Sequence, residues 1–226
     1  MLIKEVSDGI YKIKDKIYTK NLRNGLEPVY GENIITIDGI EYREWNPYRS
    51  KFCAAIKKGL KTIPIKRGTS VLYLGASEGT TPSHVSDIVR DEGIVYCVDI
   101  AQKVFDKLLK VTENRENMIP IFGDARIPDS YEDMILEKVD VIYQDVAQPD
   151  QNEILIKNAK KFLKENGYAL LCLKTRSVDV TKTPEEILEE SKKELSKYFD
   201  IVEVVNIEPY EKDHYFLVLK YTGRNL

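Results

Sequence analysis

Residues 71–82 read Val-Leu-Tyr-Leu-Gly-Ala-Ser-Glu-Gly-Thr-Thr-Pro, and this stretch decides the fold. The apolar start predicts a buried strand, the two glycines predict a tight turn, and Pro82 suits the first turn of a helix. Open α/β sheets bind ligands at the carboxyl ends of their strands, so the turn is a candidate binding loop. It lacks the G-x-G-x-x-G pattern, which argues against a dinucleotide and against an NAD-dependent oxidoreductase.

The same strand–turn–helix order continues along the chain after residue 47. Apolar runs predict strands at 71–74, 94–98, 119–122, 139–143 and 168–173. Amphipathic patterns predict helices at 49–60, 82–90, 104–112, 153–164 and 185–198. A capping box begins the last helix, with Thr183, Pro184 in the first turn and Glu186. Such alternation predicts a parallel sheet with helices on both faces.

The chain ends with two further strands, at 201–207 and 215–221, joined by residues 208–214. This connection is too short for a crossover helix, so the pair must be antiparallel. A seven-stranded, mostly parallel sheet that ends in an antiparallel hairpin resembles the class I methyltransferase fold, a Rossmann-like α/β fold.

The first part of the chain has a different pattern. Apolar and charged residues alternate at 10–13 and 34–37, and Asp38-Gly39 separates two such runs as in a β-hairpin. We therefore expect a small antiparallel β domain at residues 1–46 and an α/β domain at residues 47–226.

Composition limits the functions that are possible. The net charge is −3, so the protein cannot bind RNA through a globally basic surface and needs a local basic patch or a partner. The three cysteines have no metal-ligand spacing, and we interpret them as buried apolar residues in a protein of the reducing cytoplasm, without a metal. The N-terminal residues show neither a signal peptide nor a membrane span.

Three acidic residues follow three of the predicted strands. Asp99, Asp124 and Asp145 each come at a strand's carboxyl end, so we expect them on one rim of the sheet. An acid in the position of Asp99 can accept both hydroxyls of an adenosine ribose, and Asp124 can accept from the adenine amine. The rim is therefore a candidate adenosine site.

Longer motifs identify a family. The segments LYLGASEGTTPSHVSDIV (72–89), GDAR (123–126), VDVIYQDVAQPDQNEILIKNAKKFLK (139–164), LKTRSVDVTKTPEEI (173–187) and IEPYEKDHYFLV (207–218) occur in an order that resembles archaeal fibrillarin. The chain also starts near the fold, without the Gly/Arg-rich arm of eukaryotic fibrillarins. The resemblance implies a ribose 2′-O-methyltransferase that acts on rRNA and tRNA with S-adenosylmethionine as methyl donor.

The resemblance also implies site residues and partners. The implied S-adenosylmethionine contacts are Gly75, Ala76, Thr80, Thr81, Asp99, Ile100, Asp124, Ala125, Asp145, Val146, Ala147 and Gln148. Many relatives have Glu and an aromatic residue where this chain has Asp99 and Ile100, so adenosine binding should be looser. The implied partners are a box C/D guide RNA, a Nop-domain scaffold protein and a kink-turn-binding protein similar to a ribosomal protein.

Methyl transfer to a ribose hydroxyl needs alignment and stabilisation of a developing oxyanion. Related ribose methyltransferases use Lys-Asp-Lys and a fourth polar residue, and the matching residues are Lys51, Asp145, Lys174 and His214. Lys174 can act either as a base or, when charged, as a stabiliser of the oxyanion. We favour the second role, because Asp145 would orient Lys174 and favour its charged form. Lys51 would hold the substrate and His214 would position it, whereas His84 is interpreted as structural.

Besides the NAD-dependent oxidoreductase, the sequence allows two alternatives to an RNA methyltransferase. A stand-alone or small-molecule methyltransferase would share the cofactor loop but would not need Lys51 and Lys174 beside Asp145. A structural ribonucleoprotein subunit would keep the fold without the complete catalytic set.

Overall fold

The computed structural model describes residues 3–223, which form two sheets. The first sheet is antiparallel, with strand order β1-β2-β3-β5-β4. Its strands are β1 (Ile3–Ser7), β2 (Ile10–Ile13), β3 (Lys16–Lys20), β4 (Ile34–Ile37) and β5 (Ile40–Trp45). The predicted turn is present: Asp38 and Gly39, at φ of 51° and 77°, join β4 to β5 as a two-residue hairpin needs.

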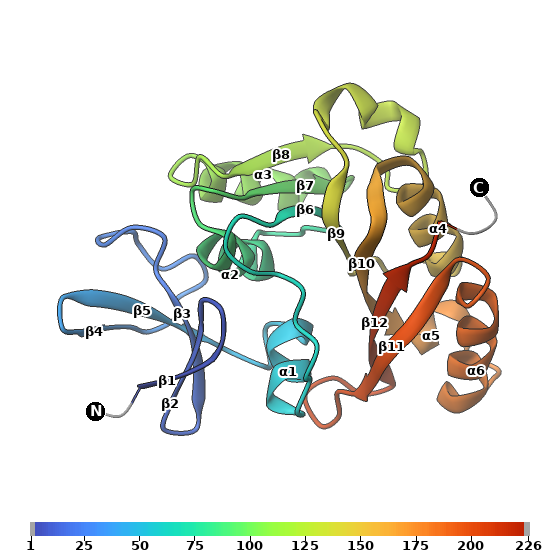
Figure 1. Cartoon of the computed structure of the whole chain (residues 1–226), viewed down its shortest axis with the longest axis horizontal. Helices are drawn as coiled ribbons and strands as arrows, with labels where there is room; N and C mark the ends of the chain where they lie inside the picture. Colours follow the sequence, from blue (N-terminus) through green and yellow to red (C-terminus); the bar gives the residue numbers. More distant parts are fainter. Residues whose placement is uncertain (1–2, 224–226) are drawn as a thin grey trace.

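The second sheet has seven strands in the order β11-β12-β10-β9-β6-β7-β8 (Figure 1). Its strands are β6 (Ser70–Leu74), β7 (Ile94–Asp99), β8 (Met118–Phe122), β9 (Val139–Gln144), β10 (Leu163–Lys174), β11 (Phe199–Asn206) and β12 (His214–Tyr221). Every pair of neighbouring strands among β6, β7, β8, β9 and β10 is parallel. Strand β12 pairs antiparallel with both β10 and β11. The predicted class I methyltransferase sheet with its terminal hairpin is confirmed.

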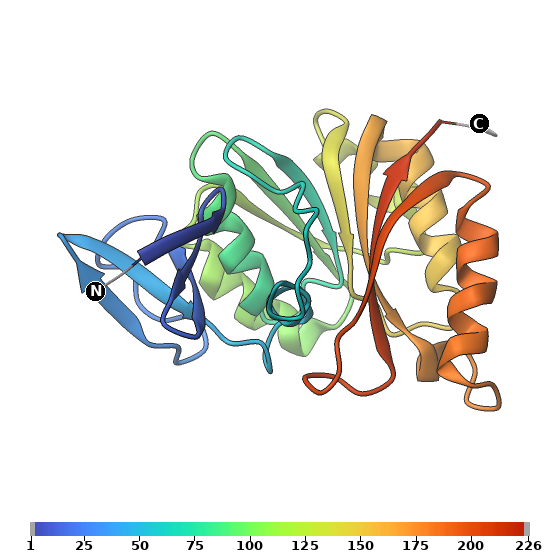
Figure 2. The ribbon, with the colours of Figure 1, turned by 60° about the horizontal axis from the view of Figure 1, so that its bottom comes forward.

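Helices cover both faces of this sheet (Figures 1 and 2). They are α1 (Lys51–Lys57), α2 (Thr80–Val89), α3 (Gln102–Thr112), α4 (Gln151–Phe162), α5 (Thr175–Val178), α6 (Pro184–Leu195) and the 3₁₀ segment η1 (Pro128–Met134). Alternate strand residues divide the core: Val71 and Tyr73 pack with α1, α2 and α3, whereas Leu72 and Leu74 pack with α4, α6 and η1. The capping box of Thr183 and Glu186 is present, but η1 and α5 were not predicted.

A buried ionic cluster joins the N-terminal sheet to α2. Arg43 donates to Glu32 and, at 2.7 Å, to Asp87, and Arg115 donates to the other oxygen of Asp87 at 2.8 Å. His84 is fully buried, 2.7 Å from the Thr19 hydroxyl and 2.8 Å from the Tyr30 hydroxyl, as its structural interpretation requires. Since α2 begins at the candidate binding loop, the cluster connects the N-terminal sheet to that loop.

All three cysteines are free and buried, and burial raises the pKa of each thiol. Within residues 3–223 no group of three or more His, Cys, Asp or Glu side chains is arranged to hold a metal. None of the helices in that range has the length and apolar character needed to cross a bilayer.

Candidate active site

Four elements bring the predicted catalytic residues together at the carboxyl rim of the sheet. Lys51 is the first residue of α1, whose N-cap is Ser50. Asp145 directly follows β9, and Lys174 is the last residue of its parallel neighbour β10. His214 begins β12 and is the register partner of Lys174.

Asp145 lies between the two lysines. Its Oδ2 is 3.2 Å from Nζ of Lys51, and its Oδ1 is 2.8 Å from Nζ of Lys174. The Lys174 ammonium also donates to the main-chain carbonyl of Asp145 at 3.0 Å. These three side chains are only 15–20% exposed. Low exposure strengthens the electrostatic interactions between them.

The charge state of Lys51 follows from its surroundings. Burial lowers its pKa, Asp145 raises it, and the net pKa lies above the ordinary value of 10.5. Lys51 is therefore an ammonium at neutral pH, suited to binding an anion or an oxygen and unsuited to removing a proton.

His214 is held as a neutral ring. Its Nδ1 lies 2.6 Å from the carbonyl oxygen of Lys212, which only accepts, so Nδ1 carries the proton and Nε2 is left as an acceptor. Burial lowers the pKa of His214, and the charges of Lys51 and Lys174 lower it further, although the Lys212 bond and Glu211 raise it. The net direction is downward, which favours the neutral form at neutral pH.

Gln151 is a positioning residue that the sequence analysis missed. Its Nε2 donates to the carbonyl of Lys174 and its Oε1 accepts from the Lys174 N–H, both at 3.0 Å. The side chain is completely buried at the start of α4. In the sequence, Gln151 is one of several polar residues before a predicted helix. Nothing local indicates its pairing with Lys174, because Lys174 is 23 residues away.

The rim opens onto a cavity of about 400 Å³. Lys51, Asp145 and Lys174 line it, together with Gly75, Asp99, Ile100, Asp124, Ala125, Val146, Ala147 and Gln148 of the predicted cofactor contacts. The carboxylate of Asp99 accepts from the N–H groups of Ser77 at 2.7 Å and Ala101 at 2.9 Å, which fixes it at the wall. The predicted rim acids are therefore brought together in one cavity.

Asp124 has a partner that the sequence analysis did not foresee. Arg126 donates to both of its carboxylate oxygens, at 3.0 and 2.7 Å. These bonds are the main cause that lowers the pKa of Asp124. Arg126 also lines the cavity, so it competes with any ligand amine for this carboxylate.

The remaining predicted contacts lie in an adjoining cavity of about 300 Å³. Ala76, Thr80 and Thr81 line it, and it shares Lys51, Gly75 and Asp145 with the first cavity. Gly75 has φ of +82°, and a Cβ there would lie 2.8 Å from the carbonyl oxygen of Asp145. Glycine is therefore needed for β6 and β9 to approach this closely at the rim.

An aromatic pair, one ring exposed and the other half-buried, lies beside the catalytic residues. Tyr48, 65% exposed, is edge to face with Tyr210 at 5.0 Å between ring centroids. They come from the segments that lead into Lys51 and His214, and the β11–β12 loop lies beside α1 in both ribbon views (Figures 1 and 2). These residues are 162 positions apart, 48 against 210, so no local pattern in the sequence brings them together.

Comparison with known proteins gives the family. The family model described as fibrillarin matches residues 2–223. The chain belongs to the fibrillarin family. The fibrillarin-like rRNA/tRNA 2′-O-methyltransferase of Pyrococcus furiosus is 52% identical to it over 217 residues, which cover 94% of this chain and 95% of the relative.

Solved fibrillarin structures agree with this assignment. The Methanococcus jannaschii fibrillarin pre-rRNA processing protein matches with a TM-score of 0.94 and 53% identity, over 99% of this chain and 98% of that one. Aeropyrum pernix fibrillarin, solved with natively bound S-adenosyl-L-methionine, gives 0.86 and 43%, over 97% and 99%. The fibrillarin of a fibrillarin/Nop5p complex gives 0.88 and 45%, over 96% and 100%.

Proposed function

We propose that this fibrillarin transfers a methyl group from S-adenosylmethionine to the ribose 2′-hydroxyl of rRNA, and also of tRNA. One observation carries the proposal: a single carboxylate, Asp145, holds two ammonium groups at the rim of a cavity walled by Asp99 and Asp124. Two cations beside one anion suit a reaction in which an oxygen gains negative charge. The named activity of the Pyrococcus furiosus relative supports it.

The cavities suit the methyl donor. The carboxylates of Asp99 and Asp124 can accept hydrogen bonds from the ribose hydroxyls and the adenine amine of the donor. The apolar side chains of Ile100, Ala125 and Val146 beside them suit its flat adenine ring. The adjoining cavity offers Ala76 and the hydroxyls of Thr80 and Thr81 to the amino-acid end. When bound, the donor supplies a methyl group on a sulfonium that a ribose oxygen can attack in line.

The chain's own residues align the hydroxyl and stabilise its charge. Lys174, fixed by Asp145 and Gln151, points its ammonium at the rim, where it stabilises the developing oxyanion. Lys51 stays protonated and holds the nucleotide. His214 accepts the hydroxyl hydrogen at Nε2 and so orients the attacking lone pair. We also propose these roles for Lys51, Asp145, Lys174 and His214, and a domain boundary at residue 46.

Partners must bring the RNA. With a net charge of −3, the chain cannot follow a long phosphate backbone. We propose that a Nop-domain scaffold protein, a kink-turn-binding protein and a box C/D guide RNA deliver the target in the cytoplasm. The Nop5p complex of a relative supports the first of these partners.

The decisive experiment measures labelled methyl transfer to a guide-matched RNA in the reconstituted complex. We expect methylation at one nucleotide, none with a 2′-deoxy substitution there, and little by the chain alone. Equal rates with and without partners would identify a stand-alone methyltransferase. Transfer that persists on the 2′-deoxy target would refute ribose methylation.

A further inference from the structure

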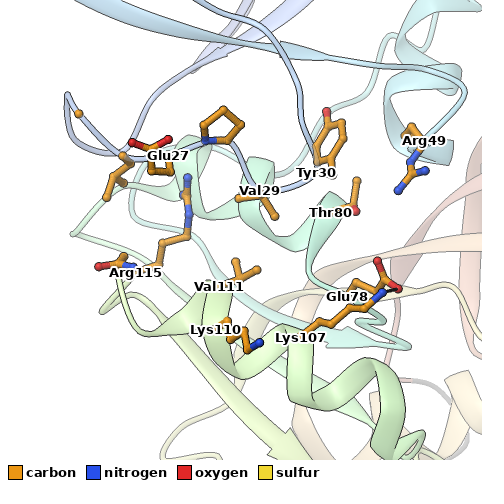
Figure 3. Close-up of a pocket in the computed structure, with 14 residues that line it drawn as sticks. Glu27, Val29, Tyr30, Arg49, Glu78, Thr80, Lys107, Lys110, Val111 and Arg115 are labelled. Carbon is orange, nitrogen blue, oxygen red and sulfur yellow. Dashed lines mark hydrogen bonds and ion pairs between the residues drawn. The ribbon is translucent and has the colours of Figure 1, made fainter.

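A third cavity, of about 530 Å³, lies between the N-terminal domain and α3, outside the cavities assigned to the methyl donor (Figure 3). The loop of residues 25–30 forms one wall and α3 forms the other. Val29 and Val111 face each other across it in Figure 3. The volume falls within the range of about 300–1,000 Å³ that is usual for ligand sites.

The cavity has an excess of positive charge. Arg49, Lys107, Lys110 and Arg115 line it, against two carboxylates, Glu27 and Glu78. Lys107 pairs with Glu78. Within residues 3–223 neither Lys110 nor the guanidinium of Arg49 has a carboxylate partner, and Arg49 lies over the Tyr30 ring at 5.8 Å. Arg49 and Lys110 are therefore available to bind an anion, and the carboxylate of Glu27 offsets only one of these two charges.

Arg115 adds an independent observation at the inner wall. Its side chain is only 2% exposed, and its Nη1 donates to Asp87 at 2.8 Å. Its Nη2 is buried and has no hydrogen-bond partner among the described residues. A buried N–H without an acceptor is unfavourable, and Arg115 adds its positive charge to this wall of the cavity.

The cavity is continuous with the catalytic residues. It shares Arg49, Glu78 and Thr80 with the cavity of about 300 Å³, which in turn contains Lys51 and Asp145. Figure 3 shows Arg49 pointing from the segment before α1 toward Thr80, at this junction. With the methyl donor in the cavity of about 300 Å³, a strand whose ribose lies at Asp145 reaches the third cavity along the rim at Arg49.

We propose that the third cavity binds the ribose–phosphate backbone of the target RNA strand near the methylated nucleotide, with Arg49 and Lys110 contacting phosphates. The inference rests on the proposed RNA methyltransferase activity and adds a substrate subsite to it. The continuity with Asp145 favours RNA over an acidic segment of a protein partner, which would have no reason to extend from the reacting centre.

The test compares Lys110→Glu with Lys103→Glu in the reconstituted complex. Both lysines are exposed on α3, but Lys103 does not line the cavity. Lys110→Glu should raise the KM for target RNA at least about five-fold, as loss of a charge-assisted phosphate contact predicts. The kcat and the affinity for S-adenosylmethionine should not change. Lys103→Glu should behave like the wild type.

A chemical probe identifies the phosphate. Target RNAs carrying one neutral methylphosphonate at successive positions should raise the KM of the wild type at the phosphates that Arg49 and Lys110 contact, and the phosphate of Lys110 is the diagnostic position. That position should have no further effect with Lys110→Ala, because the contact is already lost. Lys110→Ala should also reduce the slope of log KM against log salt by about 0.7–0.9.

Different outcomes separate the inference from the function on which it rests. If the wild-type complex does not methylate RNA, the proposed function fails first. If the complex is active and the two charge reversals give equal KM values, the subsite is refuted. If Lys110→Glu instead weakens binding of the scaffold protein, the cavity is a protein-docking site and the inference is likewise overturned.

Discussion

Gln151 and the main chain of Lys174 are joined by two hydrogen bonds of 3.0 Å that run in opposite directions. This pairing ends β10 at a defined point and fixes the main chain from which the Lys174 ammonium reaches Asp145. Gln151→Ala should therefore lower the single-turnover rate about ten- to a hundred-fold, because small displacements at a reacting centre have large effects.

The same substitution leaves a buried N–H and a buried carbonyl unpaired, so it should also destabilise the fold by about 1–3 kcal/mol. Urea unfolding measures this loss. Asn152→Ala is the control, since Asn152 donates to Glu194, on α6, instead. An unchanged rate in folded Gln151→Ala protein would remove Gln151 from the positioning of Lys174.

Lys174→Ala should reduce single-turnover methylation about a hundred- to a thousand-fold with little change in S-adenosylmethionine affinity, because the ammonium acts on the developing oxyanion. Asp145→Ala should damage both rate and affinity, since Asp145 contacts both lysines and lines the donor cavity. Calorimetry and rapid-quench kinetics separate the two quantities. Equal losses of both for Lys174→Ala would make that lysine structural.

The pH profile should report His214. Its pKa lies below the ordinary 6.5, with burial as the first cause, so the ring becomes protonated only at more acidic pH. Protonation removes the acceptor at Nε2, so kcat/KM should fall as pH falls through this lowered pKa and level off above it. His214→Ala should lower the plateau and abolish this acidic limb. A limb that survives in His214→Ala belongs to another group.

Removal of the shared cation from the buried ionic cluster should destabilise the fold strongly. Arg43→Leu leaves the buried carboxylates of Glu32 and Asp87 without their shared partner, which should cost about 3–5 kcal/mol. Arg23→Leu is the matched control, because Arg23 is 45% exposed and its pairs should contribute only about 0–1 kcal/mol. Chemical unfolding of both variants tests the difference, and equal losses would contradict it.

Acid should weaken the same cluster. Burial alone would raise the pKa of Asp87, but Arg43 and Arg115 outweigh it and hold the pKa well below the ordinary 3.8. The stability that this carboxylate contributes is therefore present above pH 3.8 and is lost as pH falls toward its folded pKa.

Alanine substitutions of Asp124 and Arg126 should differ in their effect on the affinity for the methyl donor. Asp124→Ala removes a charged acceptor for the adenine amine and should weaken binding by about 1.5–3 kcal/mol. Arg126→Ala frees the carboxylate from its present partner and should leave affinity equal or higher. Titration calorimetry measures both. Weaker binding in Arg126→Ala would show that Arg126 itself contacts the donor.

Local patterns were enough to predict the architecture. The alternation of apolar strands with amphipathic helices, the short 208–214 connection and Asp38-Gly39 predicted both sheets, the terminal hairpin and the hairpin at residues 38–39, since these features depend on neighbours in the chain. The hairpins that join β1, β2 and β3 were not predicted. The acids at Asp99, Asp124 and Asp145 could be placed on one rim because the carboxyl ends of parallel strands meet there. The segments η1 and α5 were missed because both are short and their local patterns are weak.

Only the tertiary structure decided the side-chain partners. The sequence placed Asp145 and Lys174 directly after predicted strands, Lys51 in the first predicted helix and His214 before the last strand, but it did not show that one carboxylate holds both ammonium groups. Gln151, the tyrosine pair, the Arg126 contact and the cavity beside α3 all depend on side-chain direction and packing. Most of them also join segments that are far apart in the chain. Contacts of this sort leave no periodic pattern in the local sequence.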